Sequence, residues 1–139
     1  MIQKDHFGAS RGPNAGRIGR FKDLIASGVR VGDLLTLSGQ VSVNNDGDVV
    51  GSGDIGLQLR QAYSNVRDVL GQFSASMDSI VDEMWFVTDI KNVMENIEPL
   101  LAIREEVFGG PPEVTQTLAQ VSGLVMPELL IEVKCIARL

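Results

Sequence analysis

The stretch VRVGDLLTLSGQVSVNNDGDVVGSGDIGLQLRQAYSNVRDVL (residues 29–70) decides the fold, because its hydrophobic period changes partway along. Its first part is rich in leucine and β-branched residues, and Gly32-Asp33 divides it, which predicts a β-hairpin. Glycine, asparagine and aspartate then accumulate in residues 44–54, as in a turn-rich connection. From Asp54 onward the apolar residues recur at helical spacing, and Asp54 is a natural N-cap for that helix.

The rest of the chain continues this mixture of strands and helices. Residues 82–90 (DEMWFVTDI) have the aromatic and β-branched content of a strand. A second helix is predicted to end near Phe108, with Pro99 in its first turn and residues 92–97 as a turn that leads into it. Two further strands are predicted, at about 114–122 and 129–137. The order predicts an α+β domain whose two helices cover one face of a single sheet.

The face of the sheet without helices needs another cover. Aliphatic residues such as Leu118 and Leu130 are predicted to lie there, and symmetric self-association is the usual way to bury such a patch. The fold proper is predicted to start near Phe21. Residues 1–20 are therefore interpreted as an N-terminal arm or loop, and residues 21–139 as a single domain.

Composition excludes several classes of protein. The chain has 12 Lys and Arg residues against 18 Asp and Glu residues, so its net charge is −6, opposite to that of a typical nucleic-acid-binding domain. A local basic cluster does occur near the start, at Arg11, Arg17, Arg20 and Lys22. Neither a signal-like segment nor an apolar stretch of about eighteen residues is present, which predicts a cytoplasmic protein.

Residues 29–70 resemble a segment of the RidA family, also called YjgF or endoribonuclease L-PSP. The matching positions are Gly32, Ser38, Gly39, Gln40, Gly47, Asp54, Gln58, Gln61 and Asn65. The resemblance continues through VDEMWFVTDI and LLIEVKCIA and covers about residues 24–138. It implies a chorismate-mutase-like α+β domain that forms a homotrimer with ligand clefts between its subunits.

The resemblance also implies a chemistry. Members of known activity hydrolyse enamines and imines such as 2-aminoacrylate, releasing a 2-keto acid and ammonia. In them an arginine in a P-A-R-[ST] motif pairs with the substrate carboxylate, which suits the bidentate guanidinium fork. Alignment back from Glu132 places VTQT (residues 114–117) on that motif, so that Gln116 stands at the arginine position. A second alignment, through the adjacent prolines, places Glu113 there instead.

Four further residues complete the candidate site. The resemblance implies that Glu132 positions or activates the attacking water, and that backbone groups near Ser38 and Gly39 hold the polarised atom. Asn96 matches the family's asparagine if a gap of one residue is allowed. Other interpretations stay open, since Glu132 can pair with a neighbouring Lys or Arg, Gln116 can lie on a polar interface, and the Ser38 segment can be a structural bend.

No metal or cofactor site is predicted. His6 is the only histidine, and Cys135 is the only cysteine. A single histidine in the N-terminal arm makes a Ser-His-Asp triad implausible, and a lone cysteine has no spaced partner for zinc. Cys135 is therefore interpreted as a small buried apolar residue.

Three functions follow from these observations. The first is a RidA-like protein with small-molecule clefts at subunit interfaces that hydrolyses an imine, an enamine or a related compound, but not as a standard 2-aminoacrylate deaminase, because the arginine is missing. The second is a metabolite-binding trimer without catalysis. The third, ribonuclease action or translation inhibition, is disfavoured by the net charge.

Overall fold

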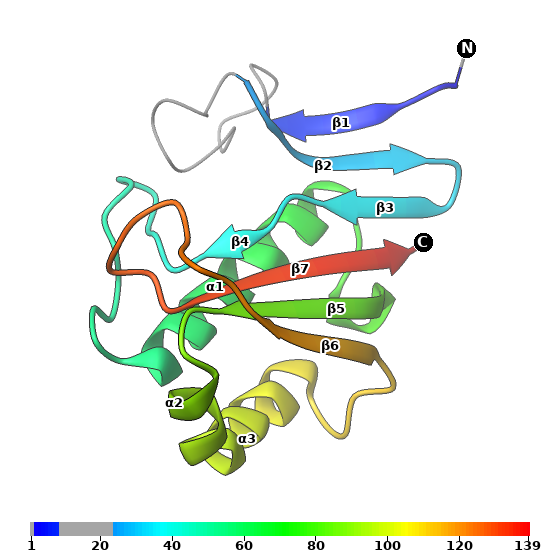
Figure 1. Ribbon diagram of the computed structural model, residues 1–139. Coiled ribbons are helices and arrows are strands. Elements are labelled where there is room, and N and C mark those ends of the chain that lie inside the picture. Colours follow the sequence, from blue (N-terminus) through cyan, green and yellow to red (C-terminus); the bar gives the residue numbers. More distant parts are fainter. Residues whose placement is uncertain (1, 9–23) are drawn as a thin grey trace.

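A computed structural model describes residues 2–8 and 24–139, including the backbone but not the side chains of residues 6–8. One seven-stranded sheet organises the chain (Figure 1), with strand order β1-β2-β3-β7-β5-β6 and with β4 paired to β7. The strands are β1 (Asp5–Gly8), β2 (Ala26–Val31), β3 (Leu34–Leu37), β4 (Gln40–Val41), β5 (Ile80–Val87), β6 (Thr115–Gln120) and β7 (Ile131–Arg138). The α+β fold class predicted from the sequence is confirmed.

The helices pack against one face of this sheet. They are α1 (Ile55–Gln72), the 3₁₀ helix η2 (Met77–Ser79), α2 (Ile90–Glu95) and α3 (Ile97–Phe108). The main core lies between them and the sheet, where Leu59 and Tyr63 of α1 and Leu100 of α3 are buried together with Trp85 and Val133. None of the described helices is long and apolar enough to cross a membrane.

Local sequence explains the first half of the fold. Gly32 adopts φ +61°, a left-handed conformation that suits glycine, and it joins β2 to β3 as the predicted hairpin. Helix α1 begins after Asp54, whose Oδ1 accepts a hydrogen bond from the backbone N–H of Leu57 at 3.0 Å. Both the hairpin and the N-cap are confirmed.

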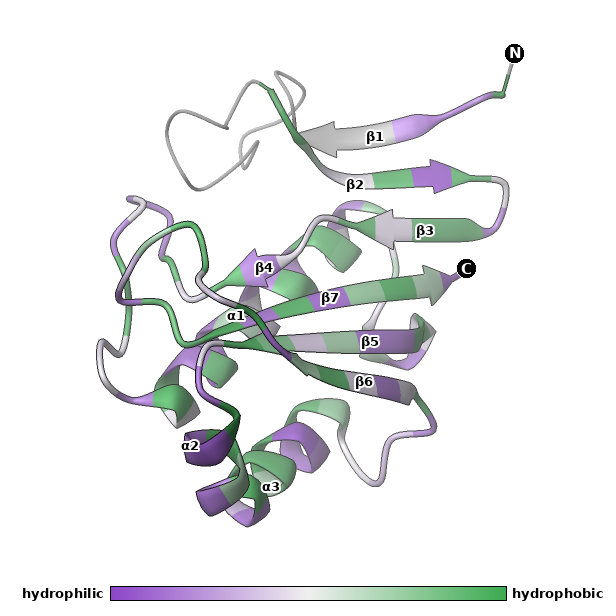
Figure 2. Ribbon diagram, in the orientation of Figure 1, coloured by the Kyte–Doolittle hydropathy of each residue, from purple (hydrophilic) through white to green (hydrophobic). Residues whose placement is uncertain are grey.

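The central strands divide their side chains between two faces. Glu83 and Trp85 of β5 pair with Cys135 and Val133 of β7, and all four are buried on the side that the helices cover. The residues between them point to the opposite side, called here the open face. Its members on β5 and β7 are Asp82, Met84, Phe86, Glu132, Lys134 and Ile136, all partly exposed in the single chain. Figure 2 shows hydrophilic residues alternating with hydrophobic ones only in the first half of β7, where Glu132 and Lys134 lie.

Three predictions from the sequence need correction. Asp5–Gly8 was expected to belong to a loop or arm but pairs with β2 as an edge strand, while residues 9–20 lie outside the described part. Ile90–Glu95 forms helix α2, where the end of a strand and the turn of residues 92–97 were expected, because Asp89 caps its first turn through the N–H of Asn92. Leu118 and Leu130 pack against the main core instead of the uncovered face.

Candidate functional site

Glu132 is the second residue of β7 and lies on the open face, against Gly39. A Cβ atom built on Gly39 would lie 2.6 Å from Cδ of Glu132 and 2.7 Å from its Oε1. No side chain larger than hydrogen therefore fits at Gly39 while Glu132 keeps this position. The two residues meet because β4 pairs with β7, with Val41 opposite Glu132.

The Glu132 carboxylate has an unusual environment for a charged group. It is partly buried, and none of the described residues donates a hydrogen bond to it. Burial raises the pKa of this carboxyl, although the nearby Lys134 ammonium partly offsets the rise. A raised pKa brings the carboxyl closer to the range in which it can both accept and return a proton.

The Ser38 segment forms a break between β3 and β4. The Ser38 backbone N–H donates to Ser27 O at 2.9 Å, and its hydroxyl donates to Ala26 O at 2.6 Å. Gln40 Nε2 closes the bend by donating to Ser38 O at 2.9 Å. Both donors of Ser38 are therefore used within the fold, whereas the N–H of Gly39 has no acceptor among the described residues.

Lys134 stands two residues beyond Glu132 on the same face of β7. Its Nζ donates a hydrogen bond to the backbone carbonyl of Leu37, the last residue of β3. The Lys134 ammonium and the Glu132 carboxylate do not form an ion pair with each other. Lys134 thus contacts the end of β3, and Glu132 contacts the break itself at Gly39.

Gln116 lies on the other side of the sheet. It pairs with Glu83 in the parallel ladder between β5 and β6, and its Nε2 donates to Glu83 Oε1 at 2.9 Å. Gln116 and Glu132 therefore project from opposite faces within one chain. The β6 residues that share the open face with Glu132 are Thr115, Thr117 and Ala119, in agreement with the alternation predicted from the sequence. All three side chains are uncharged, and β6 contains no arginine.

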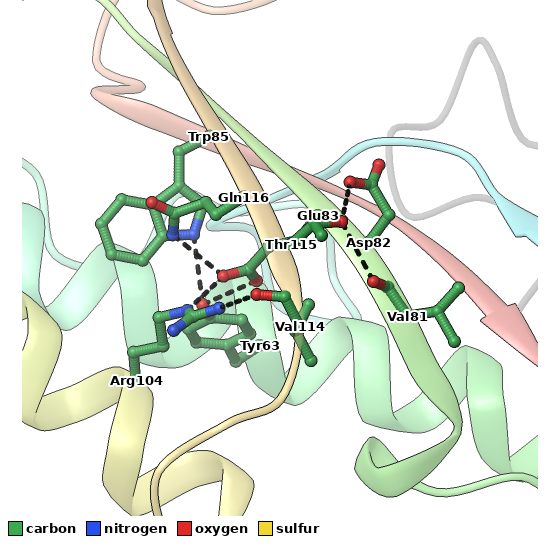
Figure 3. A network of polar contacts seen from close by, with 9 residues as sticks. All are labelled: Tyr63, Val81, Asp82, Glu83, Trp85, Arg104, Val114, Thr115 and Gln116. Carbon is green, nitrogen blue, oxygen red and sulfur yellow. Dashed lines mark hydrogen bonds and ion pairs between the residues drawn. The ribbon is translucent and has the colours of Figure 1, made fainter.

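Glu83 is the centre of a buried polar network (Figure 3). Its side chain is 0% exposed and forms an ion pair with Nε of Arg104, whose side chain is 12% exposed. Tyr63 donates its hydroxyl hydrogen to Glu83 Oε2 at 2.9 Å and accepts one from Trp85 Nε1 at 3.1 Å. Burial raises the pKa of the Tyr63 hydroxyl far above its usual range, so this hydroxyl stays a donor.

The sequence interpretation missed this network, although it contained a signal. Glu83 alternates with Trp85 and Val87 on a strand, which places a carboxylate on an apolar face and calls for a buried cation. Arg104 follows Leu100 by four residues on α3 and so lies near its buried stripe. The pairing of these two residues identifies β5 and α3 as neighbours.

Asn96 and Cys135 make no described hydrogen bond with Glu132. Asn96 is at the junction of α2 and α3, where its Nδ2 donates to Asn92 O at 2.8 Å and to Asn92 Oδ1 at 3.0 Å. Cys135 is fully buried on the helix-covered side, and burial raises the pKa of its thiol. The side chain of His6 is outside the described part. No cluster of three or more potential metal ligands occurs among the described residues.

Comparison with known proteins places this chain in a family. The sequence model of the family described as endoribonuclease L-PSP matches residues 20–139. RutC family protein YjgH of Escherichia coli (strain K12) is 33% identical over 114 residues, which are 82% of each chain. A solved structure of protein YjgH has a TM-score of 0.78 at 28% identity and covers 99% of this chain and 98% of its own.

A second solved structure extends the similarity to a protein without an assigned activity. YyfA from Yersinia pestis, described as a protein of unknown function of the conserved Rid family, has a TM-score of 0.80 at 27% identity. The alignment covers 99% of this chain and 100% of YyfA. The chain belongs to the RidA/YjgF family, also described as endoribonuclease L-PSP.

Proposed function

We propose that this protein hydrolyses a small imine, enamine or related C–N compound on the open face around Glu132. The observation that carries the proposal is the Glu132 carboxylate itself, which is partly buried, has a raised pKa and receives no hydrogen bond from the described residues. A carboxylate that only supports the fold is normally paired when it loses solvent. One that stays available suits proton transfer to and from a bound ligand.

The proposed reaction adds one water to a C=N bond. Glu132 takes a proton from the water as its oxygen attacks the carbon, and returns that proton to the nitrogen, which receives the electron pair of the former double bond. In the resulting carbinolamine the hydroxyl proton passes through Glu132 to the amine. The C–N bond then breaks with ammonia as the leaving group, and the oxygen forms the carbonyl. Both hydrogen-bond donors of Ser38 are used within the fold. The donor of this segment that remains to bind a polarised atom of the substrate is therefore the Gly39 N–H.

The group that binds the substrate carboxylate is proposed to differ from the arginine of the standard deaminases, so a lower rate than theirs is expected on their substrate. Thr115, Thr117 and Ala119 give the open face of β6 no charge, and Gln116 on the other face is bonded to Glu83. This absence of a β6 arginine also favours the alternative, a trimer that binds a metabolite without catalysis. Ribonuclease action has the weakest support, because the net charge of the chain is −6.

Ammonia release from freshly generated 2-iminopropionate tests the reaction. Native protein is compared with Glu132→Gln, with the matched variant Glu105→Gln on the exposed surface of α3, and with the uncatalysed rate. We expect Glu132→Gln to lose about 100-fold or more of the catalysed rate, since general acid–base groups contribute about that much, and Glu105→Gln to lose nothing. A native rate equal to the uncatalysed rate would favour the binding alternative, and equal rates for both variants would remove Glu132 from the mechanism.

We propose further that the open face is covered by other copies of the chain, as in the homotrimer that the family resemblance implies. Met84, Phe86 and Ile136 give this face an apolar part that no described element covers. Light scattering after size-exclusion chromatography should give three times the mass of one chain. Ile136→Asp should lower that mass, whereas Leu101→Asp, on the exposed surface of α3, should not. A cytoplasmic location stays a prediction.

A further inference from the structure

Two opposite charges lie at the break between β3 and β4 without forming an ion pair with each other. Lys134 contacts the carbonyl of Leu37 immediately before the break, and Glu132 lies against Gly39 within it. Between them the Gly39 N–H has no acceptor among the described residues. A cation, a free backbone donor and a carboxylate therefore surround one short stretch of backbone on the open face.

We propose that Lys134 binds the carboxylate of the ligand, in place of the arginine that the family resemblance implies. The inference rests on the proposed function, because it places the ligand beside Glu132. It adds the residue that determines specificity for an anionic ligand.

The dimensions suit a molecule of only a few heavy atoms. Glu132 and Lys134 are two residues apart on one strand, so their Cα atoms are separated by about 7 Å. An ammonium group has three hydrogen-bond donors, and the Lys134 ammonium uses one of them on Leu37 O. The other two donors are available for a carboxylate, whose bond to a cation is stronger than one between neutral groups.

The other charged groups on this face already have a hydrogen-bond or ion-pair partner. Among the described strands, the open face carries Asp82, which accepts a hydrogen bond from Thr115 at 2.6 Å, and Arg138, which forms an ion pair with Asp33 at 2.8 Å. On the covered side, Arg104 is paired with the buried Glu83. Lys134 is thus the cation of the described strands that is free to receive an anionic ligand on this face.

A comparison of two ligands tests the charge requirement without altering the protein. Lactate and lactamide are nearly the same size and both carry a hydroxyl donor, but only lactate is anionic at neutral pH. Titrations followed by ¹H–¹⁵N NMR should show lactate binding at least tenfold more tightly than lactamide to native protein at low salt, with the Gly39 amide among the shifted signals. Failure of lactate to bind, or equal affinities, would overturn the inference.

Variants at position 134 then identify the cation. Lys134→Met should abolish the preference for lactate over lactamide, and Lys134→Arg should retain it. Lys91→Met, the same substitution on the exposed surface of α2, should leave the preference unchanged. A preserved preference in Lys134→Met would overturn the assignment. Imine hydrolysis enters neither comparison, so its absence together with a Lys134-dependent preference would refute the proposed reaction and leave the ligand class in place.

Discussion

Two glutamates on neighbouring strands, each near a cation, have opposite environments. Glu83 on β5 is 0% exposed and binds Arg104, Tyr63 and Gln116. Glu132 on β7 is partly exposed and forms neither an ion pair with Lys134 nor a hydrogen bond with another described residue. Because a buried charge is tolerated only when it is paired, Glu83 is explained by the fold, whereas the incomplete pairing of Glu132 is the basis of the proposed ligand site.

The two glutamates differ because they lie on opposite faces of the sheet. Helices α1 and α3 bring Tyr63 and Arg104 to the covered side, so a carboxylate there finds donors within the same chain. No described helix lies over the open face, and no described residue forms an ion pair with Glu132. Substitutions near the two glutamates should therefore have different consequences for stability.

The largest expected loss of stability comes from Arg104→Ala. It leaves the fully buried Glu83 without its cation, and breaking such a pair typically costs about 3–5 kcal/mol of unfolding free energy. Arg60→Ala is the matched control, because Arg60 also pairs with a glutamate, Glu106, but both side chains are largely exposed. We expect this control to lose less than about 1 kcal/mol. Urea denaturation measures both, and similar losses would show that burial does not distinguish the two pairs.

A smaller effect on stability and a larger one on function are expected for Gly39→Ala. The new methyl group would occupy the position of the Glu132 carboxyl, which must rotate away. Since the carboxyl is the flexible end of its side chain, we expect a loss of only about 1 kcal/mol, but a fall of about tenfold or more in ammonia release, because the carboxylate is displaced. A full rate in this variant would contradict the role of the contact.

Gly71→Ala is the control for this substitution. Gly71 lies near the end of α1, and a Cβ atom there meets no other atom within 4 Å. Alanine should therefore increase the unfolding free energy by about 0.5–1 kcal/mol through its higher helix propensity. It should leave the ammonia-release rate unchanged.

The smallest expected effect is that of Glu132→Gln on stability. Burial raises the pKa of Glu132 in the folded state, so the folded protein holds this proton more tightly than the unfolded chain does. The contribution of Glu132 to stability is then complete below its usual pKa of 4.5 and is lost as the pH rises through the folded pKa. Glutamine removes that loss, and because Glu132 is partly screened by solvent the gain should be under about 1 kcal/mol.

Urea denaturation at about pH 4 and at pH 7 checks the sign. The difference in unfolding free energy between Glu132→Gln and native protein should become more favourable to the variant as the pH rises. A variant that is less stable than native protein at pH 7 would indicate that Glu132 has a stabilising partner, and would remove the contrast with Glu83.

Much of the fold was predictable from residues close together in the sequence. The Gly32-Asp33 turn, the Asp54 cap and the alternation along residues 114–121 depend on local backbone preferences, and all three are observed. Helix α2 was missed because it contains only six residues and one buried side chain, Val93, which is too little for a periodic pattern.

The candidate site was less predictable. Glu132, Ser38 and Gly39 do come together, through the pairing of β4 with β7 and the contact at Gly39. Gln116 was assigned to the same cleft from its alignment, but its hydrogen bond to Glu83 places it on the covered side in this chain. The participation of all these residues in ligand binding stays a prediction.

The sequence by itself predicted most of the strands, helices α1 and α3, the family and the absence of an arginine from β6. Only the tertiary structure decided which face of the sheet each β6 residue occupies, because alternation places neighbours on opposite faces without saying which face the helices cover. That choice depends on contacts between distant residues. Arg104 meets Glu83 across 21 positions of sequence, and Lys134 meets Leu37 across 97. Such contacts form when strands and helices pack, so no local pattern specifies them.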